Sequence, residues 1–137
     1  MARQHIRQVL AELADIHEGV MEKLAALEDA DMAKRIPWGG REMPVRFILS
    51  QIGNHDREHG IQVVKNLQWM SRQFTEAQMA VAKLAQARGE LIGLLAAVDD
   101  EDLDRVPKEG EWTIRQTLQH IVDVQKRYSA MIEKTME

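Results

Sequence analysis

Residues 45–70 of the 137-residue chain read VRFILSQIGNHDREHGIQVVKNLQWM. The apolar residues in this stretch return every three or four positions, as on one face of an α-helix; they are Val45, Ile48, Leu49, Ile52, Val63, Leu67 and Met70. Continued between Ile52 and Val63, the same stripe passes through His55 and His59. We therefore predict a long amphipathic helix with two histidines on its apolar face, because residues four apart share a face.

Three other segments, residues 6–27, 75–98 and 113–131, have the same periodicity, and strand-like alternation is absent. Thr75 and Thr113 each precede a glutamine by three residues, which predicts a capping box at two helix starts. Because a chain of this size buries one core and short connections favour antiparallel neighbours, we predict an all-α antiparallel four-helix bundle. It forms a single domain over residues 1–137, with loops after the first and third helices.

An internal repeat relates the two halves of the chain. Residues 45–52 align without gaps with residues 114–121, and a tryptophan, Trp38 or Trp112, precedes each segment. We interpret this as two helical hairpins related by an internal pseudo-twofold axis. Each tryptophan is expected to pack back on the helix that follows it, as a hydrophobic staple does.

Composition excludes several classes of function. The net charge is -4, and basic residues are interleaved with acidic ones, so no basic stripe with aromatic residues predicts nucleic-acid binding. The absence of cysteine excludes disulfides, thiolate ligands and a cysteine nucleophile. No run approaches the roughly 20 apolar residues that span a bilayer. The N-terminus leads into a charged amphipathic stretch rather than a signal core, so we expect a cytoplasmic protein without membrane contact.

Three of the five histidines, His55, His59 and His120, fall on apolar stripes. An interior imidazole costs free energy unless its ring nitrogens find partners, and a divalent metal ion supplies one. In the repeat, His120 aligns with Gln51, one turn before His55, so the three rings are expected at a similar height on facing helices. We predict a divalent metal site with His55, His59 and His120 as ligands. Core histidines held by hydrogen bonds alone are the alternative.

Two competing metal motifs fit less well. His55-Asp56-Arg57-Glu58-His59 matches the HxxEH string of inverted zinc peptidases, in which the glutamate is the general base. Those enzymes need a distant acidic ligand and a larger chain. Ferritin-like di-metal bundles need a Glu-x-x-His motif on each of two helices, and this chain has only one partial match, Asp56-x-x-His59.

Two segments carry a resemblance to a known family. Residues 112–121, WTIRQTLQHI, resemble the DinB pattern of a tryptophan, a helix start and a Leu-x-His-Ile step. Residues 55–62, HDREHGIQ, resemble its other signature, a histidine pair followed by a Gly-x-Gln-like step. The chain thus resembles the DinB/YfiT-like family of metalloenzymes. In typical members the lone histidine precedes the pair; exchanging the two halves of the repeat rebuilds the same three-histidine site.

The resemblance implies a four-helix bundle, a zinc or nickel ion on the three histidines, a homodimer and, in some relatives, a low-molecular-weight thiol cofactor. Three protein ligands leave a coordination position open, as in catalytic sites. We predict an enzyme that activates a water or a thiol for hydrolysis or thiol transfer on a small-molecule substrate. Gln51, Glu58 and Tyr128 are candidate catalytic or substrate-orienting residues. The alternative is a non-enzymatic, stress-linked binding or dimerisation module in which the metal is incidental or absent.

Overall fold

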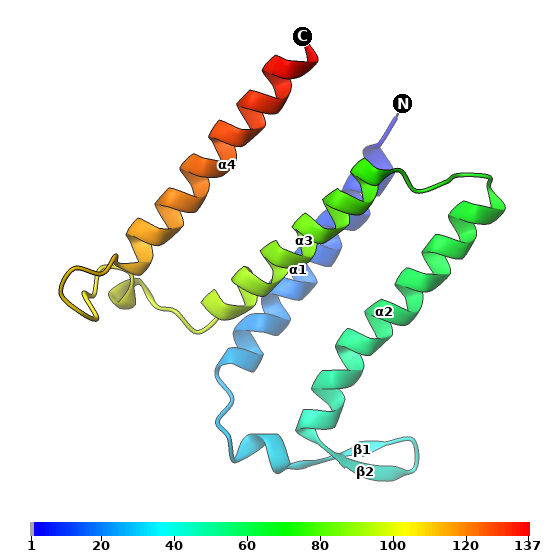
Figure 1. The fold of residues 1–137 in the computed structure, drawn as a ribbon. Coiled ribbons are helices and arrows are strands. Elements are labelled where there is room, and N and C mark those ends of the chain that lie inside the picture. The colour runs from blue at the N-terminus through cyan, green and yellow to red at the C-terminus, as the bar shows by residue number, and fades with distance from the viewer. Residues whose placement is uncertain (1) are drawn as a thin grey trace. The chain divides into compact units, whose positions relative to one another are not determined.

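Four long helices account for most of the chain in the computed structural model, which describes residues 2–137 (Figure 1). They are α1 (Gln4–Ala25), α2 (Val45–Trp69), α3 (Glu76–Leu95) and α4 (Ile114–Met136). Each contains most of one segment in which the apolar period predicts a helix. The predicted number and order of helices are therefore confirmed for the described part of the chain.

Both predicted capping boxes are present. Thr75 Oγ1 accepts a hydrogen bond from the Gln78 backbone N–H at 3.2 Å, and Gln78 Oε1 accepts one from the Thr75 N–H at 2.9 Å. The same reciprocal pair joins Thr113 and Gln116, at 3.1 and 2.8 Å. Each box satisfies two backbone donors that a helix start leaves unpaired. α3 and α4 consequently begin directly after the two threonines.

The connection between α1 and α2, predicted as a loop, contains a short β-hairpin, while the rest of the fold is helical, as the all-α class predicts. β1 (Arg35–Trp38) and β2 (Arg41–Pro44) pair antiparallel. Gly39 and Gly40 form the two-residue turn with φ values of 55° and 80°, the backbone of a type I′ turn. Strands of four residues are too short for alternation to stand out, and the Gly-Gly pair is the signal that indicates the hairpin.

The hairpin is attached to the first turn of α2. The 3-10 helix η1 (Asp31–Ala33) leads into it, and the Val45 N–H donates to the Lys34 carbonyl at 2.9 Å. Arg46 Nε donates to the Met32 carbonyl at 3.3 Å. These bonds fix the base of the hairpin against the start of the helix that carries His55 and His59.

The chain divides into two units by its contacts. The first ends at Ala96 and contains α1, the hairpin, α2 and α3, with the chain reversing direction before α2 and again before α3 (Figure 1). In it, the terminal methyl of Met21 lies 3.6 Å from the position that a Cβ of Gly93 would take, so α1 and α3 approach each other there. The second unit, Ala97–Glu137, contains η2 (Asp100–Asp102) and α4. The single domain and the bundle remain predictions.

The apolar stripes of the helices face solvent within these units. None of residues 2–137 is fully buried, and Leu13 and Ile16, central in the α1 stripe, are 56% and 58% exposed. The described helices include none that is long and apolar enough to cross a membrane.

Candidate metal centre

His55 and His59 lie one turn apart on α2, and their rings converge. The two Nε2 atoms are 3.1 Å apart, and the ring centroids are 4.4 Å apart with an angle of 71° between the planes. Both side chains are exposed, so a ligand can reach the nitrogens from solvent. The i, i+4 spacing that predicts a shared face also brings the two Nε2 atoms close together.

The geometry of this pair fits a common metal ion. Zinc–imidazole bonds are about 2.0–2.1 Å long, so two such nitrogens at angles of roughly 90–109° lie about 2.8–3.4 Å apart. The Nε2–Nε2 distance of 3.1 Å falls within that range. Neutral imidazole nitrogens also suit zinc and nickel as ligands. The pair can therefore supply two adjacent ligands with little rearrangement of the backbone.

A glutamine one turn further along α2 supports the second imidazole. His59 Nδ1 lies 2.9 Å from Gln62 Oε1. Histidines that bind metals commonly donate the hydrogen of the other ring nitrogen to such an acceptor. Gln62 belongs to the HDREHGIQ motif but is not among the site residues predicted from the sequence. Its i+3 position relative to His59 is the signal that identifies it.

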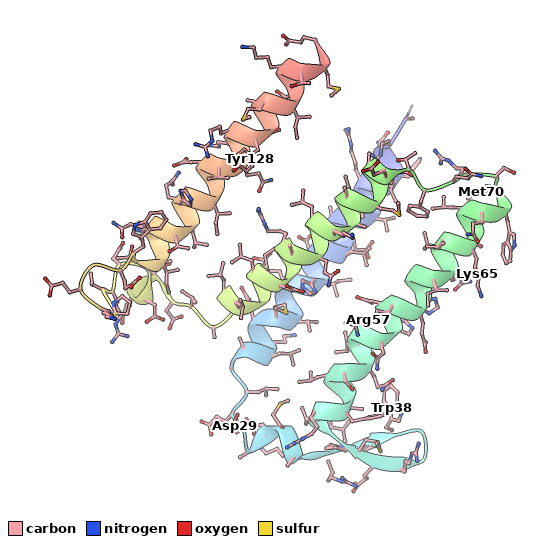
Figure 2. The ribbon with its side chains drawn as sticks, in the orientation of Figure 1. Asp29, Trp38, Arg57, Lys65, Met70 and Tyr128 are labelled. Carbon is pink, nitrogen blue, oxygen red and sulfur yellow. The ribbon has the colours of Figure 1, made fainter. Side chains whose placement is uncertain are left out.

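A cleft of about 410 Å³ adjoins His55. Its lining residues come from β1 and α2; they are Trp38, Ile48, Gln51, Ile52, His55, Asp56 and Glu58. The hairpin places Trp38 beside the first turns of α2, where its ring meets Phe47 edge-on at 6.0 Å, as the staple interpretation predicts (Figure 2). Two of the candidate residues, Gln51 and Glu58, thus lie in one cleft with a predicted ligand.

The chemical character of this cleft is apolar with an acidic margin. Trp38, Ile48 and Ile52 supply carbon surface, and Asp56 and Glu58 supply two carboxyl groups. Of the described residues that line it, none is lysine or arginine. The cleft therefore favours a neutral or cationic molecule with an apolar part over a polyanion. Asp56 is a further lining residue that is not among the site residues predicted from the sequence.

His120 lies in the second unit, on α4, beside the tryptophan that precedes that helix. The Trp112 and His120 rings meet edge-on with centroids 4.9 Å apart. Both line a second cleft of about 510 Å³, together with Arg115, Gln116, Gln119 and Asp123. Gln119 Nε2 donates to Asp123 Oδ1 at 2.9 Å. A tryptophan, a glutamine and a histidine thus occur together in each unit.

An ion pair fixes the start of α4. Arg115 Nε donates to Asp104 Oδ1 at 2.7 Å, and Arg115 Nη2 donates to Oδ2 at 3.1 Å. This two-point hydrogen bond lowers the pKa of Asp104 below its ordinary value of 3.8 and raises the pKa of Arg115. The Arg115 backbone N–H also donates to the Leu103 carbonyl at 3.0 Å. The loop residues Leu103 and Asp104 are therefore tied to the first turn of α4.

Tyr128 lies further along α4, as Figure 2 shows, and is 55% exposed. The Arg127 guanidinium carbon is 5.4 Å from the centre of its ring, a cation–π distance. The structure thus brings together His55, His59, Gln51 and Glu58, whereas His120 and Tyr128 belong to the other unit. Within either unit, the described residues include no cluster of three His, Cys, Asp or Glu side chains suited to a metal ion.

Comparison with known protein families matches part of the chain. The family model described as the DinB superfamily matches residues 83–136, which include most of α3, η2 and α4 with His120. This match supports a DinB-like relationship for that part of the chain; α2 and its histidine pair lie outside it. No curated protein and no solved structure matches the chain.

Proposed function

We propose that this chain is a DinB-like, metal-dependent enzyme that folds as an antiparallel four-helix bundle and forms a homodimer. The family match over residues 83–136 supports the DinB-like relationship for the segment that contains α4. The motif of residues 55–62 supports it for α2. The exposed apolar stripes of all four helices support the bundle, because they need cover.

The proposed metal ligands are His55, His59 and His120, with zinc or nickel as the ion. The observation that carries the proposal is the convergence of the His55 and His59 Nε2 atoms at 3.1 Å, the spacing of two adjacent ligands. His120 is proposed as the third ligand from its position on the α4 stripe and in the internal repeat.

A divalent ion with three imidazole ligands would have a coordination position open to a water or a thiol. The ion would lower the pKa of the group bound there, to roughly 7 for water on zinc. The chain supplies the surroundings. Trp38 and the two isoleucines of the cleft would bind the apolar part of a substrate and exclude water. Glu58, which lines the same cleft as His55, would accept a proton, and the Gln51 amide would hold a polar group by hydrogen bonds.

Of the two nucleophiles, the cleft favours water. Low-molecular-weight thiols such as glutathione carry carboxylate groups, and the cleft beside His55 contains Asp56 and Glu58 without a lining lysine or arginine among the described residues. The carboxylates of such a thiol and of these two residues would repel each other, which disfavours binding. Hydrolysis of a neutral or cationic small molecule is therefore the reaction that we favour, with thiol transfer second.

The exposed apolar stripes also support a second candidate, the non-enzymatic binding or dimerisation module. Ile6, Leu13 and Ile16 form a continuous line along α1, and each is more than two-fifths exposed, at 45%, 56% and 58%. Such a face suits a partner helix, whatever the chemistry at the histidines.

The test separates the two candidates by metal content and turnover. We expect purified protein to contain about one zinc or nickel ion per chain by elemental analysis, as a three-histidine site requires. A His55→Ala/His120→Ala double variant should lose the ion. His5→Ala and His17→Ala, which change the two α1 histidines, are matched controls and should retain it.

Metal-dependent turnover is then assayed with ester and amide substrates and with bacillithiol, mycothiol and glutathione. Turnover that disappears with the ion supports the enzyme. A bound ion without any turnover favours the binding module. Wild-type protein that takes up no divalent ion contradicts the metal proposal.

A further inference from the structure

The hydrogen bond between His59 and Gln62 favours one of the two ring nitrogens of His59 as the carrier of the hydrogen. His59 Nδ1 lies 2.9 Å from Gln62 Oε1. An amide oxygen accepts hydrogen bonds and cannot donate them, so Nδ1 is the donor. A neutral imidazole has one N–H, and Nε2 of His59 therefore carries a free lone pair.

The same contacts favour the opposite tautomer in the neighbouring ring. His55 Nε2 lies 3.1 Å from His59 Nε2, within hydrogen-bond distance. Because His59 Nε2 carries no hydrogen, the hydrogen of this bond is on His55 Nε2. The two imidazoles of the pair are thus unequal: His59 presents a lone pair, and His55 donates to it.

We propose that Gln62 is a positioning residue that sets the tautomer and ring orientation of His59, so that the His59 Nε2 lone pair is ready for the metal ion. The inference rests on the proposed metal site and deepens it. His59 would bind without a change of tautomer. His55 would have to lose the hydrogen from Nε2 to solvent and gain one at Nδ1, which leaves its charge unchanged.

The placement of Gln62 on the helix gives this role a physical basis. Residues 59 and 62 are i and i+3 on α2, which makes them neighbours on the helix surface. Both are exposed, so water competes for His59 Nδ1 and the glutamine biases the tautomer rather than locking it. Loss of such an outer hydrogen-bond partner typically lowers metal affinity about 10–100-fold.

The experiment compares three variants with the wild type. Gln62→Met keeps the length of the side chain and removes the acceptor. Gln62→Glu keeps an acceptor oxygen. Gln68→Met makes the same change at another exposed glutamine of α2 and is the matched control. The tautomer of each imidazole is read from ¹⁵N NMR of the metal-free protein, at a pH where the rings are neutral, and Zn²⁺ affinity is measured by calorimetry.

We expect the wild type to show Nδ1–H on His59 and Nε2–H on His55. Gln62→Met should move His59 toward the Nε2–H tautomer and weaken Zn²⁺ binding about 10–100-fold. Gln62→Glu should keep the wild-type tautomer and affinity or increase the affinity, and Gln68→Met should change neither.

Two results would overturn the inference: a wild-type His59 with its hydrogen on Nε2, or a tautomer that Gln62→Met leaves unchanged. If Gln62→Glu weakens binding as much as Gln62→Met does, the acceptor role is also wrong. If the wild type binds no Zn²⁺, the proposed function fails, whereas the NMR measurement on metal-free protein still decides the role of Gln62.

Discussion

Asp104 and Arg115 illustrate how a single exposed side-chain pair contributes to a local structure. The guanidinium contacts both carboxylate oxygens, at 2.7 and 3.1 Å, and the pair joins residues eleven positions apart. The pKa of Asp104 is lowered by this hydrogen bond first and by the charge of Arg115 second. A lowered folded-state pKa means that the stabilisation is complete above 3.8 and is lost as the pH falls through the folded-state value.

We therefore predict that Arg115→Gln returns the pKa of Asp104 to about its ordinary value of 3.8, measured by NMR titration of the carboxyl group. Acid should also destabilise Asp104→Asn less than the wild type in the same pH range. Arg105→Gln is the matched control. It should leave the pKa of Asp102 lowered, because the largest cause there is the Asp99 backbone N–H. An Asp104 pKa that Arg115→Gln does not change would contradict the assignment.

Part of the candidate site around the histidines can be predicted from the sequence. The spacing of His55 and His59 predicts that they share a helix face, and the Nε2 atoms do converge. The cleft beside them depends on Trp38, whose position follows from a hairpin that the helical period does not predict. Whether His120 joins the pair depends on tertiary packing, which no local pattern determines.

Among the elements, the helices and their caps are predictable because their signals are local. A threonine three residues before a glutamine specifies both hydrogen bonds of the capping box, and α3 and α4 begin where it predicts. The hairpin is different. Its strands have four residues each, and the signal for it resides in two glycines rather than in a period.

The turn of the hairpin yields a prediction at this scale. Gly40 has a φ of 80°, and a side chain there should destabilise the hairpin by about 1 kcal/mol, because residues with a Cβ are strained in left-handed backbone. Gly40→Ala should accordingly speed amide hydrogen exchange across β1 and β2. The free energy of unfolding by urea should fall by no more than that amount.

Gly89→Ala in α3 is the matched control for this substitution. A Cβ at Gly89 meets nothing within 4 Å, and alanine is the better helix former by about 0.5–1 kcal/mol. The control should therefore stabilise the chain or leave it unchanged. If Gly40→Ala left the exchange rates of the hairpin amides unaltered, the type I′ turn would be in doubt.

For the whole molecule, the central physical question is what covers the apolar stripes. Hydrophobic residues make up 45% of the chain, yet none of residues 2–137 is fully buried within its unit. Soluble proteins rarely leave apolar patches larger than a few hundred Å² in water. The amphipathic period predicts that one face of each helix is covered. It does not predict the covering surface, which depends on how helices far apart in the sequence associate. The apolar stripes of other helices in the chain, or of a second copy of the chain, would cover such a face.

Leu13, in the middle of the α1 stripe, tests whether that cover exists. If Leu13 is solvated, Leu13→Asn lowers the free energy of unfolding only through the poorer helix propensity of asparagine, by up to about 0.7 kcal/mol. If Leu13 is covered by a partner, the substitution also removes its packing. Truncating such a buried side chain lowers the free energy of unfolding by about 2–5 kcal/mol. We predict the larger loss for Leu13→Asn, measured as the free energy of unfolding in urea.

Ala11→Asn is the matched control, since residue 11 lies on the side of α1 opposite the stripe and its change costs propensity alone. Repeating the measurement over a range of protein concentrations identifies the cover. A loss that is independent of concentration indicates packing within one chain, and a loss that depends on it indicates a second copy. Equal effects of the two substitutions would mean that the stripe stays in water, and the bundle would then lose its physical basis.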